Sequence, residues 1–294
     1  MEKNNIKNYL HLHFIVFIWG FTAVLGKLIT IKAIPLVWFR LSIATIFILL
    51  YLIFKRTYLK ISIKKLVHYI IGGVIIAIHW IAFFYAIKVS NVSVTLATLS
   101  TGAFFASFLE PLFFKKKIKA YEIGLSLLTF IGIAIIFKVE TQYSLGIIIA
   151  LIAAFLSALF SVINASFIEN ENANIISFYE LLFATIFISI VVLFKEGFSI
   201  KFFQMSQNDW IYIIILGSIC TAYALTASTK LLKKISPFTM MITVNLEPVY
   251  GIILALLVFG NDEKMEVTFY YGAILIFIGV IINGIVKSRS RNNS

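Results

Sequence analysis

The chain has few charged residues, one cysteine and few prolines for its length. Charged residues make up 13% of its 294 positions, whereas a soluble domain carries roughly 25%. The single cysteine, Cys220, leaves no disulfide framework and no cysteine-based metal site. The pattern Gly-x-x-x-x-Gly-Lys-[Ser/Thr] is absent, which excludes an internal ATPase motor of that type. No metal and no cofactor are therefore expected.

Long apolar runs dominate what remains, because 61% of the residues are hydrophobic. Each run holds about 20 residues, which is enough to cross ~30 Å of hydrocarbon. The runs are continuous and lack the alternation of an outer-membrane barrel. They predict an all-α membrane protein with ten transmembrane helices, at 11–31, 35–54, 67–87, 91–114, 120–138, 144–167, 174–195, 210–231, 236–259 and 269–287.

The distribution of lysine and arginine predicts the orientation in the membrane. With the N-terminus inside, 17 of these residues fall in cytoplasmic segments and 7 in outer segments. We therefore expect both termini in the cytoplasm. The same bias explains the net charge of +12 without a nucleic-acid partner. Heavy use of Ile, Lys, Asn and Phe suggests an AT-rich bacterial genome, so the expected location is the bacterial cytoplasmic (inner) membrane, as a multi-pass protein.

The two halves of the chain resemble each other. The segment Ala-Thr-Ile-Phe-Ile occurs at 44–48 and again at 184–188. The segment "FIGIAII" at 130–136 is similar to "FIGVIIN" at 277–283. Five spans per half is an odd number, so the second half enters the membrane from the opposite side. This predicts two inverted-topology five-helix repeats, which many secondary transporters share. The alternative is chance similarity among Ile- and Phe-rich segments. The expected domains are 1–138 and 142–287, followed by a cytoplasmic tail at 288–294.

Several short motifs, in this order, carry a family resemblance. They are Trp19-Gly20 with Lys27, Phe39-Arg40, "FFYAIKVSNVSVTLATLS" and "YGAILIFIGVII". On these the chain resembles the drug/metabolite transporter superfamily, in its EamA-like ten-helix branch, over nearly its full length. The resemblance implies two five-helix repeats, a central cavity, and export or exchange of small metabolites, often amino acids. It implies a small-molecule substrate and a lipid environment as partners.

Glu247 is the strongest candidate for a functional residue. It lies midway along the ninth predicted span, within Asn245-Leu246-Glu247-Pro248. On a continuous helix, Ser236, Met240, Thr243, Glu247 and Tyr250 would form one polar stripe. The functional interpretation is a cation, amine or proton site, with Asn245 beside it, and hence proton coupling. The structural interpretation is a carboxylate that pairs with Arg40 or caps a helix break. The second Leu-Glu-Pro, at Glu110, lies near a predicted interface, and a structural role is favoured there.

Arg40 and Glu180 occupy corresponding positions of the two repeats. Both lie within reach of an interface, where a long side chain can place its charge in water. One interpretation is therefore a structural ion pair or an interfacial anchor. The other is that Arg40 contacts a substrate carboxylate, because a guanidinium binds planar anions in a bidentate manner. A deep carboxylate together with Arg40 suits a zwitterion, so an amino acid is the first substrate to consider and a hydrophobic amine or drug the second.

The other polar or aromatic candidates lie on the first, third, sixth and eighth spans. His79 can relay a proton or, more simply, donate one hydrogen bond while neutral. The faces that carry Ser157, Asn164 and Thr221 can line a cavity or pack closely against other helices. Trp19 and Trp80 can form an aromatic cavity wall. The predicted substrate-binding set is Glu247, His79, Trp80, Trp19, Asn164, Ser157, Thr221, Asn245 and Arg40.

Two function classes can be compared on these residues. A secondary transporter is favoured by the repeats and by the few deep charges. A membrane-embedded enzyme would need a compact nucleophile, metal or acid/base cluster. The only aspartates, Asp209 and Asp262, lie in predicted outer loops, which disfavours that class. The expected protein is therefore not an enzyme. It is a monomer or homodimer that exports or exchanges small metabolites by alternating access.

Overall fold

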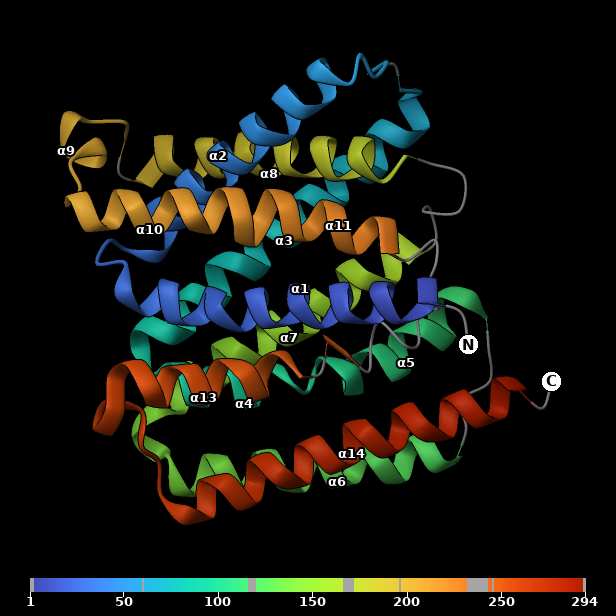
Figure 1. Cartoon of the computed structure of the whole chain (residues 1–294). Coiled ribbons are helices and arrows are strands. Elements are labelled where there is room, and N and C mark those ends of the chain that lie inside the picture. Colours follow the sequence, from blue (N-terminus) through green and yellow to red (C-terminus); the bar gives the residue numbers. More distant parts are fainter. Residues whose placement is uncertain are drawn as a thin grey trace.

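The computed structural model describes residues 3–59, 61–115, 120–165, 172–195, 197–231, 243–244 and 246–292, and within these ranges the chain forms helices and no strands (Figure 1). The long elements are α1 (Lys3–Leu28), α2 (Ala33–Phe54), α3 (Ile63–Val89), α4 (Val92–Leu99), α5 (Gly102–Phe114), α6 (Ala120–Val139), α7 (Ser144–Ala165), α8 (Ala173–Lys195), α10 (Gln207–Gly217), α11 (Ala224–Leu231), α13 (Glu247–Phe259) and α14 (Val267–Asn292). A short helix, α9 (Ile200–Phe203), follows α8, and a π-helical turn (Ser218–Tyr223) joins α10 to α11.

Seven helical segments among the described residues are long and apolar enough to cross a membrane. They are Ile6–Leu28, Ala33–Phe54, Lys65–Val89, Val92–Phe114, Thr141–Ala165, Ala173–Lys195 and Gln207–Leu231. The helices α6 and α14 contain the shorter apolar stretches Leu128–Val139 and Val267–Gly279. Together with α13, these are the ten predicted spans, so the expectation of an all-α membrane fold is confirmed.

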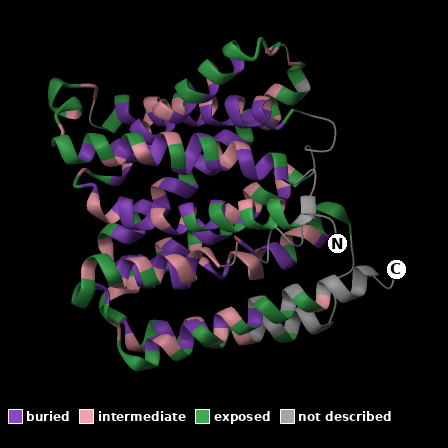
Figure 2. Cartoon of the chain, in the orientation of Figure 1, coloured by how far each residue is buried: buried purple, intermediate pink, exposed green. Residues whose placement is uncertain are grey.

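The helices run roughly along one direction, and α1 begins at the same end of the bundle where α14 ends (Figure 1). We call this the terminal end and the opposite one the far end. Buried residues gather on the helix faces that meet inside the bundle (Figure 2). Outward faces carry large apolar side chains such as Phe54 and Phe194, which are 82% and 89% exposed. In a bilayer these side chains meet lipid tails.

The two halves of the bundle meet at corresponding helices. α2 packs against α8, and α6 packs against α14. Within the repeated Ala-Thr-Ile-Phe-Ile segments, the hydroxyl oxygens of Thr45 and Thr185 lie 3.2 Å apart. At the other crossing, a Cβ placed on Gly132 would lie 2.8 Å from the Gly272 carbonyl oxygen, and one on Gly272 would lie 2.9 Å from the Gly132 carbonyl oxygen. Such reciprocal contacts are what a twofold axis between inverted repeats produces.

The ninth span contains a helix break, as the structural interpretation of Glu247 expected, and the polar stripe of a continuous helix is not present. A turn at Leu246 precedes α13, which begins at Glu247. Pro248 explains the break, because proline suits the first turn of a helix, where its missing N–H needs no partner. The stripe from Ser236 to Tyr250 is therefore interrupted, and residues 232–242 and 245 lie outside those described. The fourth span is also divided, between α4 and α5.

Candidate functional site

Three spans depart from regular α-helix part-way along their length. α4 ends at Leu99 before α5 begins at Gly102, α10 passes into the π-helical turn, and α13 begins at Glu247. Irregular backbone inside a membrane is tolerated only where it meets protein or water. π-Helical turns are also frequent at functional sites. The interior polar residues beside these breaks are therefore candidates for a functional site.

Arg40 extends from α2 into the interior and is 3% exposed. Its Nε donates to the Thr221 hydroxyl at 2.7 Å, and its guanidinium carbon lies 4.0 Å from the centre of the Trp80 ring. The Phe84 ring lies farther away, at 5.4 Å. The aromatic faces stabilise the cation in a site that contains little water. The other side of the guanidinium lacks such contacts. Its Nη1 is buried and has no hydrogen-bond partner among the described residues.

Thr221 is positioned for Arg40 by the π-helical turn. Its own hydroxyl donates to the Leu216 carbonyl at 2.7 Å, five residues earlier, which leaves the oxygen lone pairs for the guanidinium. Thr221 is 1% exposed. The arrangement orients Arg40 firmly at Nε and leaves Nη1 as an unused donor. The interpretation of Arg40 as an interfacial anchor does not fit this burial.

Glu247 is the first residue of α13 and is partly buried. Its carboxylate interacts electrostatically with Arg40. Among the described residues it has no ion pair within 4.0 Å and no side-chain hydrogen bond. A helix N-terminus also favours a negative charge. The interior therefore presents a cation and an anion that influence each other without direct contact.

His79 lies near this pair but is occupied by another partner. It is 7% exposed, and its Nδ1 donates to the Ala153 carbonyl at 2.8 Å. It also interacts electrostatically with Arg40, and two neighbouring positive charges repel each other. Both observations favour a neutral histidine that joins α3 to α7. Its neighbour Trp80 contributes to the site through its ring.

The remaining predicted residues do not gather around Arg40. Asn164 lies beside a different charge, because its Nδ2 donates to Glu180 Oε2 at 3.4 Å. Ser157 is partly buried, and its carbonyl accepts the Ser161 hydroxyl at 2.9 Å. Trp19 packs against the main hydrophobic core. Asn245 lies outside the described residues.

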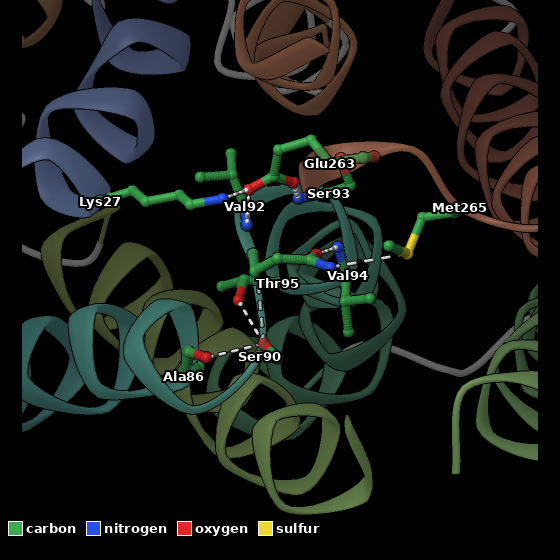
Figure 3. Close-up of polar contacts among 10 residues, drawn as sticks. Lys27, Ala86, Ser90, Val92, Ser93, Val94, Thr95, Glu263 and Met265 are labelled. Atoms are coloured by element: carbon green, nitrogen blue, oxygen red, sulfur yellow. Dashed lines mark hydrogen bonds and ion pairs between the residues drawn. The ribbon is translucent and has the colours of Figure 1, made fainter. Parts of the chain in front are cut away.

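A second polar cluster fixes the far end of the bundle, around the fully buried side chain of Glu263 (Figure 3). One carboxylate oxygen accepts from Lys27 Nζ at 2.9 Å and from the backbone N–H of Val92 at 2.9 Å. The other accepts from the backbone N–H of Ser93 at 2.8 Å. Since Val92 and Ser93 begin α4, the carboxylate also caps a helix N-terminus. We call these four residues the far-end latch.

Sequence reasoning missed this latch. Glu263 follows α13 in a short turn (Gly260–Glu263), and a loop carboxylate is ordinarily solvated. One available signal was Asn91, a typical helix N-cap, whose side chain accepts from the Val94 N–H at 2.8 Å. That signal marks the start of α4 but not the carboxylate that reaches it from the other half of the chain.

Two further contacts tie the same end of α1 to its neighbours. Lys88 Nζ donates to the Ile29 carbonyl at 2.5 Å. Asp209 accepts from both the backbone N–H and the hydroxyl of Thr30, at 2.7 Å each. A positive charge near the last carbonyls of a helix is favourable. The far end of α1 is thus held by residues from both halves.

Comparison with known proteins identifies the family. The sequence profile of the EamA-like transporter family matches residues 8–138 and again residues 144–285. The chain belongs to the EamA-like transporter family. The resemblance predicted from the short motifs is therefore confirmed, and the chain is a multi-pass membrane protein.

Individual relatives are distant. The chain is 26% identical over 207 residues to an "Uncharacterized transporter" of Clostridium kluyveri. The match covers 68% of this chain and 65% of that protein. It is 22% identical over 227 residues to "Uncharacterized transporter YxxF" of Bacillus subtilis, covering 75% and 70%. A solved crystal structure with 15% identity matches with a TM-score of 0.66, over 95% of this chain and 98% of that one. This last likeness concerns the fold alone.

Proposed function

We propose that the chain is a secondary transporter that exports or exchanges small metabolites, with neutral amino acids as the first candidates. Family membership supports transport as the activity. The single observation that supports the substrate class is the unused, buried Nη1 of Arg40, with the Glu247 carboxylate in its electrostatic range. A buried donor without a partner is costly unless a ligand satisfies it. A substrate carboxylate supplies that partner.

The two charges suit the two ends of a zwitterion. Arg40 is oriented by Thr221 and Trp80, so a carboxylate can accept from its free N–H group. Glu247 has no side-chain hydrogen bond among the described residues and can accept from a substrate ammonium group. The two groups form no ion pair within 4.0 Å of each other, and the proposal places the zwitterion between them. Binding between the repeats and alternating access to the two sides follow the mechanism of inverted-repeat transporters.

Counterflow exchange in reconstituted vesicles tests this proposal with three matched probes. Radiolabelled leucine carries both charges, isopentylamine carries only the ammonium group, and 4-methylpentanoate carries only the carboxylate. We expect exchange of leucine and weak or no exchange of the other two. If isopentylamine alone exchanges, the substrate is a hydrophobic amine and Arg40 does not contact it. If none exchanges, the amino-acid assignment is wrong.

Glu247→Gln is the decisive variant, and the second Leu-Glu-Pro provides its control. Glu247→Gln keeps size and removes the charge, so leucine exchange should fall because the ammonium group loses its partner. Glu110→Gln makes the same chemical change in α5, close to the end of that helix. It should leave leucine exchange per folded molecule near that of the parent. Equal loss in both variants would show that the effect is not specific to the ammonium site.

A further inference from the structure

Glu180 is a buried carboxylate that the substrate site does not use. It is 4% exposed and is the eighth residue of α8, a span that runs from Ala173 to Lys195. At 1.5 Å per residue it lies about 10 Å inside the helix. One carboxylate oxygen, Oε2, accepts from Asn164 Nδ2 at 3.4 Å. The other, Oε1, lies against Gly72 of α3, where an added Cβ would be 2.5 Å away.

No described cation accompanies this carboxylate. The elements packed against α8 are α2, α3 and α11, with Asn164 of α7. Their charged or titratable side chains have other contacts. Arg40 of α2 contacts Thr221 and Trp80. On α3, His79 donates to Ala153, Lys88 donates to Ile29, Tyr69 stacks on Tyr179, and Lys65 and His68 near the helix start also have interactions. Lys230 of α11 lies 3.4 Å from the Tyr51 hydroxyl. Asn164 is thus the polar contact of Glu180 within the described part of the chain.

Burial without a counter-charge among the described residues favours the protonated state of Glu180. An isolated carboxylate away from water costs so much free energy that the group takes up a proton instead. Glu247 also loses contact with water on burial, but unlike Glu180 it has a positive charge, that of Arg40, in its electrostatic range. Asn164 can serve either state of Glu180. Its Nδ2 donates to an ionised oxygen, and a 180° turn of the amide would let Oδ1 accept the carboxyl O–H at a similar separation.

We propose that Glu180 is a proton-binding site that couples transport to the proton gradient. In the conformation described here the carboxyl group is protonated. When the terminal end opens to water, the proton leaves a Glu180 carboxyl oxygen for water, and the ionised group is then hydrated. Rebinding of a proton is required before the group can be buried again. The proposal rests on the transport activity proposed above and assigns its coupling step to a residue outside the substrate pair.

Infrared spectroscopy tests the protonated state without any substrate. The purified full-length protein in lipid nanodiscs should show the C=O stretching band of a protonated carboxyl group at pH 7. Glu180→Gln should lose this band, whereas the matched variant Glu247→Gln should keep it. Glu180→Asp keeps a titratable group and should retain a shifted band if the protein folds. A spectrum unchanged by Glu180→Gln would overturn the proposal.

Vesicle transport then separates coupling from substrate binding, with radiolabelled leucine as the probe. Glu180→Gln should keep leucine counterflow and lose accumulation driven by an imposed pH gradient. Glu247→Gln should reduce both. Accumulation by Glu180→Gln equal to that of the parent would refute the coupling role. If the parent does not exchange leucine at all, the substrate proposal fails by itself, and the infrared result still decides whether Glu180 binds a proton.

Discussion

Arg40 and Glu180 hold the same position in the two repeats, yet their surroundings are opposite. Each is the eighth residue of its helix, α2 from Ala33 and α8 from Ala173. Each presents its backbone carbonyl to a glycine of a neighbouring span: a Cβ on Gly217 would lie 3.1 Å from the Arg40 oxygen, and one on Gly73 would lie 2.6 Å from the Glu180 oxygen. The backbone packing is therefore common to both repeats.

The surroundings of the Arg40 and Glu180 side chains differ, although the packing of the backbone around them is the same. Arg40 has a hydroxyl partner, an aromatic face and the opposite charge of Glu247 in its range, whereas Glu180 has one long amide contact. Close helix packing thus preserves the symmetry of the fold, while the charged side chains at the shared position break it. We expect this asymmetry to separate a substrate contact from a proton site.

The largest difference in Tm and in leucine exchange should be the one between Arg40→Gln and Glu180→Gln. Arg40→Gln removes the cation in the electrostatic range of Glu247, together with the hydrogen bond to Thr221 and the contact with the Trp80 ring, and disruption of a buried polar network is among the strongly destabilising changes. It should lower the Tm of the solubilised protein and abolish leucine exchange. Glu180→Gln replaces a group that we infer to be neutral already, so its Tm should stay near that of the parent. Equal destabilisation by both variants would contradict the difference between the two sites.

Arg40→Lys tests whether Arg40 acts through its positive charge alone or through its directed N–H groups. Lysine keeps the positive charge but has no planar fork for a carboxylate and is more strongly hydrated than a guanidinium. The variant should recover part of the lost Tm, because Glu247 again has a cation in range. Leucine exchange should recover much less. Full recovery of exchange would show that the site needs only a charge at this position, and not the directed N–H groups of Arg40.

Much of the fold could be predicted from the sequence because lipid imposes simple requirements. Apolar runs fixed the spans, and the repeated Ala-Thr-Ile-Phe-Ile segments pointed to helices that do meet, at Thr45 and Thr185. The candidate functional site was harder to predict from the sequence. Arg40 lies in sequence where it can reach an interface, and only the tertiary packing of Trp80 and Thr221 around it shows that it points inward.

Other features depended on contacts between distant segments. The start of α13 at Glu247 follows from Pro248, but proline can kink a helix as well as begin one, so spacing alone did not distinguish the two. Asn164 shares a predicted face with Ser157, yet it contacts Glu180. The partners of Glu263 come from α1 and α4, between 170 and 236 positions earlier in the chain. No local pattern encodes such pairs.

The far-end latch should show a smaller effect than Arg40, although it joins the two repeats. Glu263→Gln removes the ion pair with Lys27 and weakens the cap of α4. Loss of a helix cap costs about 1 kcal/mol, and Lys27 is 25% exposed, so its share of the loss is reduced by water. We expect a smaller fall in Tm than for Arg40→Gln. Asp262→Asn, in the same turn, is the control and should leave Tm unchanged.

The reciprocal glycines offer a test of the symmetry itself. Gly132→Val and Gly272→Val each place a side chain against the carbonyl of the other glycine, and such overpacking costs about 1–3 kcal/mol. If a twofold axis passes through this crossing, the two variants should lower the Tm by similar amounts. Gly124→Ala in the same α6 has open space around its Cβ and serves as the control. A large effect from only one of the two valine variants would contradict the reciprocal packing.

The smallest expected effect concerns the hydroxyl pair between α2 and α8. Thr185 also donates to the Leu181 carbonyl at 2.7 Å, so the hydrogen in the 3.2 Å contact comes from Thr45. Interhelical hydrogen bonds in membranes contribute ~0.6 kcal/mol on average. Thr45→Val should therefore cost about that amount in the parent and almost nothing in a Thr185→Val background, where its acceptor is gone. A double-mutant cycle of unfolding free energies measures the difference. Identical costs in both backgrounds would mean that the two hydroxyls contribute independently, and that apolar packing alone holds this symmetric contact together.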